Sequence, residues 1–262
     1  MVKKEAIIEW KEFLPWQKDE MVEQDLVICR ALVNLFNDEY LAKHLAFRGG
    51  TALHKLYLKP QQRYSEDIDL VQINAEPIKE TIDRIRQVLS FLGKPEIKQK
   101  RHNNTLIFRF QSEIPPIIPI RLKIEINCRE HFNVLGLTQY AFNVKSQWFT
   151  GSCNVTTYHL EELLGTKLRA LYQRRKGRDL FDLYKALSMQ KVSMENIIRC
   201  YQEYIRFVVV NVPTQKEYLQ NMELKMQDKE FLDDTFLLLS PDCKYSPLEA
   251  WELVRSHIIE KL

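Results

Sequence analysis

The chain has 262 residues, of which 45% are apolar and 28% are charged, fractions typical of soluble globular proteins that exclude wholesale disorder. The 38 basic and 35 acidic residues give a net charge of +3, too balanced for a histone-like protein, although a local basic patch remains compatible with it. The longest apolar runs are far shorter than the ~20 residues of a membrane helix. Five isolated cysteines disfavour a disulfide framework and a zinc knuckle, and with no recognisable signal peptide we expect a cytoplasmic protein.

Helical and strand patterns alternate in the first half of the chain. Apolar residues at three- and four-residue steps predict a helix from Glu20 to Asn37. Residues 45–48 form a short apolar run before Gly49-Gly50, and a short helix is expected over 51–57. Further strands are predicted over 68–73, 96–100, 105–111 and 119–127, with a helix over 77–92 and a hairpin turn at 102–104.

From Leu160 the apolar period becomes helical and stays so. Helices are predicted over 160–172 and 179–187, with Gly177 between them, where a helix-ending residue belongs. About two to four further helices should follow, up to residues 247–262. We therefore predict an α+β protein, with a mixed sheet flanked by helices in a domain of residues 1–155 and a helical bundle in a domain of residues 156–262.

The most informative residues are Asp67 and Asp69, two positions apart on a predicted strand, so that both carboxylates project from one face. Like charges side by side repel unless a cation lies between them or one is protonated, which makes the pair a candidate Mg²⁺ site. Glu125 alternates with isoleucines on a later strand. If the two strands are neighbours, Glu125 becomes the third ligand and the three carboxylates should converge on a common point. The alternative is a set of solvated surface carboxylates.

A second signal lies just upstream, where the predicted strand 45–48 turns through Gly49-Gly50 into a helix. Such a turn exposes backbone amides at the start of the helix and can bind an anion. Thr51 can cap that helix or donate its hydroxyl group to a phosphate. The alternative is an ordinary tight turn.

These residues resemble the nucleotidyltransferase superfamily related to DNA polymerase β: Gly49-Gly50-Thr51, then Ser65 to Asp69, then a lone carboxylate on a later strand. The superfamily usually has Ser where this chain has Thr51, and more often Asp where it has Glu125. More closely, the chain resembles the AbiEii/AbiGii toxin family over about residues 20–190. The strings that carry this closer resemblance are 47–57, 63–70, 166–171 and 178–184.

The resemblance implies an NTP-dependent nucleotidyltransferase in which the helical domain completes the active-site cleft. Asp67, Asp69 and Glu125 would hold Mg²⁺, or Mn²⁺ in its place. The nucleotide would contact Gly49, Gly50, Thr51, Ser65 and Lys167. Asp179, chosen over Asp182, would act beside Lys167; alternatively Lys167 is a solvated helix residue, and Asp179 is the N-cap or lies in the first turn of its helix.

The implied reaction moves NMP from an NTP to RNA, with tRNA as the expected acceptor, and the enzyme would be the toxin of a type IV-like system with a cognate antitoxin as its partner. Arg174, Arg175, Lys176 and Arg178 belong to a basic string that would suit an RNA backbone, or that is simply a solvated helix end. Two other functions stay open: transfer to a protein hydroxyl or a small molecule, and a non-catalytic module that binds a partner.

Overall fold

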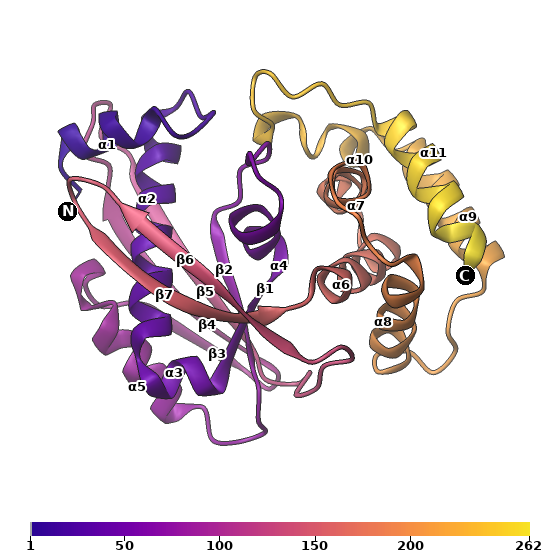
Figure 1. Ribbon diagram of the computed structural model, residues 1–262, viewed down its shortest axis with the longest axis horizontal. Helices are drawn as coiled ribbons and strands as arrows, with labels where there is room; N and C mark the ends of the chain where they lie inside the picture. The colour runs from indigo at the N-terminus through magenta and orange to yellow at the C-terminus, as the bar shows by residue number, and fades with distance from the viewer. Residues whose placement is uncertain (1) are drawn as a thin grey trace. The chain divides into compact units, whose positions relative to one another are not determined.

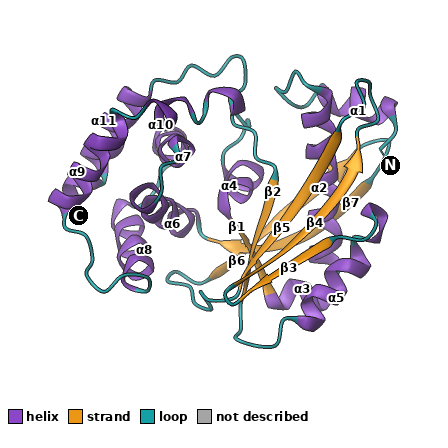
Figure 2. Ribbon diagram, turned by 180° about the vertical axis from the view of Figure 1, so that it is seen from behind, coloured by secondary structure: helices purple, strands orange, loops and turns teal. Residues whose placement is uncertain are grey.

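The computed structural model describes residues 2–262, which divide into two compact units (Figure 1). Unit 1 comprises residues up to 56, 64–132 and 137–157. Unit 2 comprises residues 57–63, 133–136 and 158–262. Unit 1 contains a mixed sheet with helices, and unit 2 is helical (Figure 2). The predicted α+β class, with a mixed sheet flanked by helices followed by a helical bundle, is confirmed.

The sheet of unit 1 has the strand order β3-β4-β5-β2-β1-β7-β6. At its centre, β2 runs parallel to β5 and antiparallel to β1. Alternate residues of β2 and β5, such as Ile68 and Ile124, are fully buried, and this burial fixes which face the remaining side chains occupy. The strands are β1 (Leu45–Arg48), β2 (Asp67–Gln72), β3 (Glu96–Lys100), β4 (Asn103–Gln111), β5 (Pro119–Asn127), β6 (Leu137–Lys145) and β7 (Thr150–Tyr158).

The helices of unit 1 pack through apolar stripes; α2, α3 and α5 contact one another, and α2 also contacts β5 and β6. A buried ion pair between Lys55 and Asp25 fastens the turn after α4 to α2, and Trp10 Nε1 donates to Asp25 Oδ2 at 3.0 Å. The helices are α1 (Lys4–Lys11), α2 (Asp19–Asn37), α3 (Glu39–His44), α4 (Gly49–Ala52), a π-helical turn (Leu53–Tyr57), α5 (Lys79–Val88) and a 3₁₀ turn (Ser90–Leu92).

Unit 2 is built around α6, which packs against α7 and α8. Gly165 allows α8 to come close, because a Cβ atom at this position would lie 2.5 Å from Cys200 Cβ. None of the helices in residues 2–262 has the length and apolar character needed to cross a membrane. The helices are α6 (Leu160–Gln173), α7 (Gly177–Met189), α8 (Met194–Arg206), α9 (Gln215–Met226), α10 (Lys229–Asp233) and α11 (Pro247–His257), with 3₁₀ turns at Phe236–Leu238 and Ile259–Lys261.

Some local expectations differ from the structure. The hairpin β6–β7 had no predicted counterpart, since β6 is largely exposed and carries few of the buried apolar positions that mark a strand. Gly177 does not end α6 but begins α7; it is glycine because a Cβ atom would lie 2.1 Å from Phe231 O. The hairpin turn is at residues 101–102, and Asn103 and Asn104 already belong to β4.

One buried carboxylate ties the short segment 133–136 to the helices of unit 2. Glu162, fully buried on α6, accepts hydrogen bonds from Val134 N at 2.8 Å, Leu135 N at 2.9 Å and the Tyr204 hydroxyl group at 2.8 Å. Both carboxylate oxygens are therefore needed as acceptors.

We expect Glu162→Gln to lower the free energy of unfolding by about 1–3 kcal/mol, because one oxygen becomes an NH₂ group that faces a buried donor. Glu161→Gln is the matched control, since Glu161 is partly exposed and accepts only one long bond, from Ser193 N at 3.3 Å. Denaturant unfolding of both variants measures the difference. Equal losses would show that the three bonds to Glu162 contribute no more to stability than the single bond to Glu161.

Candidate active site

The pairing of β2 with β5 brings the predicted acidic residues together on one face of the sheet. In the parallel register, Asp67 lies opposite Lys123 and Asp69 lies opposite Glu125. Alternation along each strand then places these four side chains on the same face. The Asp67 and Glu125 side chains are 27% and 35% exposed, so this face is open to solvent and to a ligand.

Lys123 forms the centre of this acidic face. Its Nζ lies 2.7 Å from Asp67 Oδ2 and 3.1 Å from Glu125 Oε1. Burial lowers the pKa of Lys123, but its hydrogen bonds with Asp67 and Glu125, and their charges, outweigh burial and leave the pKa above its usual value. The ammonium group is therefore a cation shared by two of the three predicted ligands.

The arrangement differs from the expected convergence of three carboxylates on one point. Within residues 2–262, no group of three or more His, Cys, Asp or Glu side chains is placed to hold a metal ion. Instead, Asp67 and Glu125 meet at Lys123 Nζ. Carboxylate oxygens are nevertheless the ligands that Mg²⁺ prefers, and two of them already share a cation, so the donor set suits a divalent metal.

Gly49 lets the third carboxylate, that of Asp69, approach the turn between β1 and α4. A Cβ atom at Gly49 would lie 2.1 Å from Asp69 Oδ2, and the backbone has a φ of +80°. Both the close approach and the positive φ require glycine. Gly50 follows as the second residue of α4, partly exposed like Gly49.

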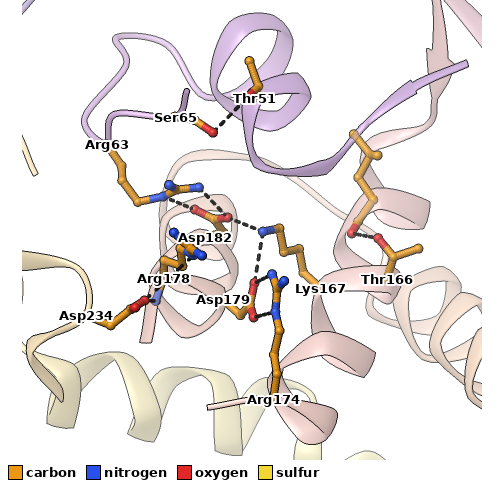
Figure 3. A network of polar contacts seen from close by, with 11 residues as sticks. Thr51, Arg63, Ser65, Thr166, Lys167, Arg174, Arg178, Asp179, Asp182 and Asp234 are labelled. Atoms are coloured by element: carbon orange, nitrogen blue, oxygen red, sulfur yellow. Dashed lines mark hydrogen bonds and ion pairs between the residues drawn. The ribbon is translucent and has the colours of Figure 1, made fainter. Parts of the chain in front are cut away.

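Thr51 has a different role from the two that were expected. It is only 1% exposed, and the N-cap residue of α4 is Arg48, which makes no side-chain cap. The Thr51 hydroxyl donates to the main-chain oxygen of Asp67 and lies 2.8 Å from Ser65 Oγ (Figure 3). Because its single proton is used on Asp67, Ser65 donates to Thr51. Thr51 therefore holds the segment that leads into the acidic strand.

Gln24, which the sequence reasoning did not single out, braces the same segment from α2. Its side-chain oxygen accepts from the Tyr64 hydroxyl at 2.9 Å, and its nitrogen donates to Arg121 O at 2.8 Å and Glu66 O at 3.3 Å. A lone glutamine in an apolar helix carries no sequence signal for this position. It ties the chain before Asp67 to the start of β5.

Unit 2 contains a second charge cluster, centred on Lys167 (Figure 3). Lys167 Nζ lies 3.0 Å from Asp179 Oδ1 and 2.8 Å from Asp182 Oδ2. Both aspartates are fully buried and Lys167 is 6% exposed. Lys167 is thus not a solvated helix lysine, and it contacts Asp182 as well as the predicted Asp179. The sequence signal for Asp182 is its spacing of three residues from Asp179, which puts both on one face of α7.

Two arginines complete this cluster by forming paired hydrogen bonds. Arg63 Nε and Nη2 donate to Asp182 at 2.8 and 3.0 Å, and Arg174 Nε and Nη2 donate to Asp179 at 2.6 and 2.8 Å. Burial raises the pKa of Asp179, but Lys167 and Arg174 outweigh burial and hold the pKa below its usual value. Three cations thus surround two carboxylates, which leaves these five side chains with one excess positive charge.

The four basic residues expected to bind RNA all have acidic partners in unit 2. Besides the Arg174–Asp179 contact, Arg175 lies 3.3 Å from Asp228, and Lys176 and Arg178 lie 3.4 and 3.9 Å from Asp234. The side chains remain 38–69% exposed. Arg175, Lys176 and Arg178 therefore connect the start of α7 and the residues before it to the two ends of α10. All four side chains present their outer edges to solvent.

We expect Gly49→Ala to destabilise the protein by about 1–3 kcal/mol more than Gly93→Ala. Gly93 is the matched control because its φ is +81°, yet a Cβ atom there would meet nothing within 4 Å. Strain from the positive φ is common to both variants, so the difference isolates the clash with Asp69. Thermal melting measures it, and identical melting temperatures would mean that the contact between residue 49 and Asp69 adds nothing to the destabilisation.

Comparison with known proteins places this chain in a family. The profile described as nucleotidyl transferase AbiEii toxin of a type IV toxin–antitoxin system matches residues 30–253. No curated protein matches the chain. Among solved structures, MenT4, a nucleotidyltransferase toxin from Mycobacterium tuberculosis, has a TM-score of 0.61 and 15% identity over 98% of this chain and 88% of its own. JHP933 from Helicobacter pylori has a TM-score of 0.53 and 16% identity, with 92% of each chain covered.

At these identities, the structural likeness shows a shared fold. The family profile, in contrast, spans most of the chain and includes both charge clusters described above. The chain therefore belongs to the AbiEii family of nucleotidyltransferase toxins.

Proposed function

We propose that this nucleotidyltransferase transfers NMP from an NTP to an RNA acceptor, with tRNA as the expected acceptor. The observation that carries the proposal is the acidic face of β2 and β5, where Asp67 and Glu125 already share a cation, Lys123 Nζ. A divalent metal, which would in turn bind the phosphates of a nucleotide, is the partner that such a partly exposed carboxylate set suits best.

The reaction is an in-line displacement at the α-phosphorus of the NTP. An acceptor hydroxyl oxygen forms the new P–O bond, the bond to the β-phosphate breaks, and pyrophosphate leaves. Positioning and charge neutralisation supply most of the catalysis. When bound by Asp67, Asp69 and Glu125, Mg²⁺ or Mn²⁺ would supply positive charge to the phosphates and acidify the acceptor hydroxyl.

Further residues of the chain would contact the nucleotide. We assign phosphate contacts to the partly exposed backbone at Gly49 and Gly50, with Ser65 beside them; the buried Thr51 supports this segment. Lys167 would attract the triphosphate, and the excess positive charge of its cluster supports this role. Asp179 and Asp182 would fix the Lys167 ammonium group.

The acceptor side of the proposal rests on the basic connection after α6. The outer edges of Arg174, Arg175, Lys176 and Arg178 remain exposed and would contact an RNA backbone. The reaction would take place in the cytoplasm, where the five free cysteines stay reduced. As a toxin, the enzyme would be controlled by a cognate antitoxin protein.

Incubation of the full chain with each labelled NTP and total RNA, with Mg²⁺ or with chelator, tests the function. We expect label on RNA only when metal is present. Asp67→Asn should reduce transfer by at least about 100-fold, the range for removing one stabilising group in the transition state. Label that survives RNase digestion would move the acceptor to a protein or small molecule. Undiminished transfer by Asp67→Asn would remove the acidic face from the mechanism.

A second experiment addresses Lys167. We expect Lys167→Gln to raise the KM for NTP and to lower kcat, at a cost of about 1–3 kcal/mol in stability, since the buried aspartates lose a charged partner. Lys185→Gln is the control, because Lys185 on α7 lies over the Phe181 and Tyr184 rings rather than beside a carboxylate. A stability loss with unchanged KM and kcat would make Lys167 a structural residue only.

A further inference from the structure

We propose that Lys123 is an internal competitor of the divalent metal, and that the metal must displace the lysine ammonium group from Asp67 and Glu125 in order to bind. This inference rests on the proposed function, since it concerns the same acidic face, but it assigns a role to a residue outside the proposed catalytic and nucleotide-binding set.

The contacts of Lys123 carry the inference. Its Nζ is 2.7 Å from Asp67 Oδ2 and 3.1 Å from Glu125 Oε1, so one ammonium group uses an oxygen of each carboxylate. A metal ion bound by the same two carboxylates needs those electron pairs. The lysine and the metal are both cations, and they cannot share the space between the two side chains.

The same contacts also give Lys123 a role in the stability of the acidic face. Asp67 and Asp69 share one face of β2, and the register sets Asp69 opposite Glu125 on β5. Without a cation, these side chains repel one another. Lys123 neutralises part of this charge from within the chain, so the acidic face can fold without depending on bound metal.

Displacement of Lys123 requires little rearrangement. Its side chain is 25% exposed, and a flexible lysine stem allows the ammonium group to move into water. Lys167 provides a contrast within the same protein, because it is 6% exposed and held between two fully buried aspartates. Of these two carboxylate-bridging lysines, Lys123 is therefore the one suited to exchange with a metal.

The consequence is a threshold for metal binding. The enzyme would load its metal only when the free concentration is high enough to outcompete an ammonium group that is always present. Because the contacts are partly exposed, the competition should weaken metal binding moderately rather than abolish it.

Isothermal titration of the full chain with Mn²⁺, without nucleotide, measures the competition directly. We expect Lys123→Met to bind Mn²⁺ about three- to thirtyfold more tightly than the wild type, the range for losing two partly exposed ion pairs. Lys98→Met is the matched control: Lys98 Nζ lies 3.1 Å from Glu96, also two residues away on its own strand, yet neither residue belongs to the acidic face. The Lys98→Met variant should bind Mn²⁺ with the affinity of the wild type.

Thermal melting adds a second measurement that does not depend on activity. In chelator, Lys123→Met should melt below the wild type, and saturating Mn²⁺ should raise its melting temperature by more than it raises that of the wild type. Lys123→Gln keeps a polar group at the end of the side chain and replaces Lys123→Met if that variant folds poorly. Lys123→Gln should also bind Mn²⁺ more tightly than the wild type does.

The outcomes separate this inference from the proposed function. Wild-type Mn²⁺ binding that Asp67→Asn abolishes, together with unchanged or weaker binding by both Lys123 variants, would overturn the competitor role and leave the metal site intact. Absence of any Mn²⁺ binding that depends on Asp67, in the wild type and in the Lys123 variants, would overturn the competitor role and the proposed metal site together.

Discussion

Repulsion between carboxylates on two neighbouring strands is the constraint on which the site depends. The parallel register of β2 and β5 sets Asp69 opposite Glu125, and burial of the alternate isoleucines prevents either strand from turning its acids away. The surrounding structure accommodates this arrangement. Lys123 neutralises part of the charge of Asp67 and Glu125. Gly49 leaves room for Asp69, and Thr51 and Gln24 hold the segment before the strand. Carboxylates whose repulsion would destabilise an ordinary sheet are thereby held close together, where they can bind a cation.

Unit 2 handles buried charge in another way. Asp179 and Asp182 are fully buried, and each contacts Lys167 and receives two hydrogen bonds from an arginine. Such paired, charge-assisted hydrogen bonds are about twice as strong as neutral ones, and removal of one partner would leave a buried charge uncompensated. Arg63 comes from the short segment 57–63 and Arg174 from the end of α6. The cluster therefore fixes the position of α7 as well as the direction in which the Lys167 ammonium group points.

Much of the fold could be predicted from the sequence because its central elements are amphipathic or continuously apolar. The strand β1, the strand β5 and the long helix α2 lie within a residue of their predicted bounds. The hairpin β6–β7 could not be found in the same way, since β6 buries few side chains. In the site, alternation correctly placed Glu125 on the face of its strand opposite the buried Ile124 and Ile126. The ion pairs of Arg63 with Asp182 and of Arg175 with Asp228 join segments far apart in the sequence, so no local pattern predicts them.

Lys167 and Lys123, which each bridge two carboxylates, illustrate how burial sets the role of a charge. Lys167 has two fully buried partners and almost no exposure, so its charge is fixed in place and can only attract a ligand that comes to it. Lys123 has two partly exposed partners and is itself partly exposed, so it can exchange them for water at low cost. The first lysine is suited to hold an anion repeatedly in the same geometry. The second is suited to leave its position, because a divalent cation of higher charge competes for the same oxygens. The acidic face can therefore exchange its lysine contacts for metal contacts without refolding.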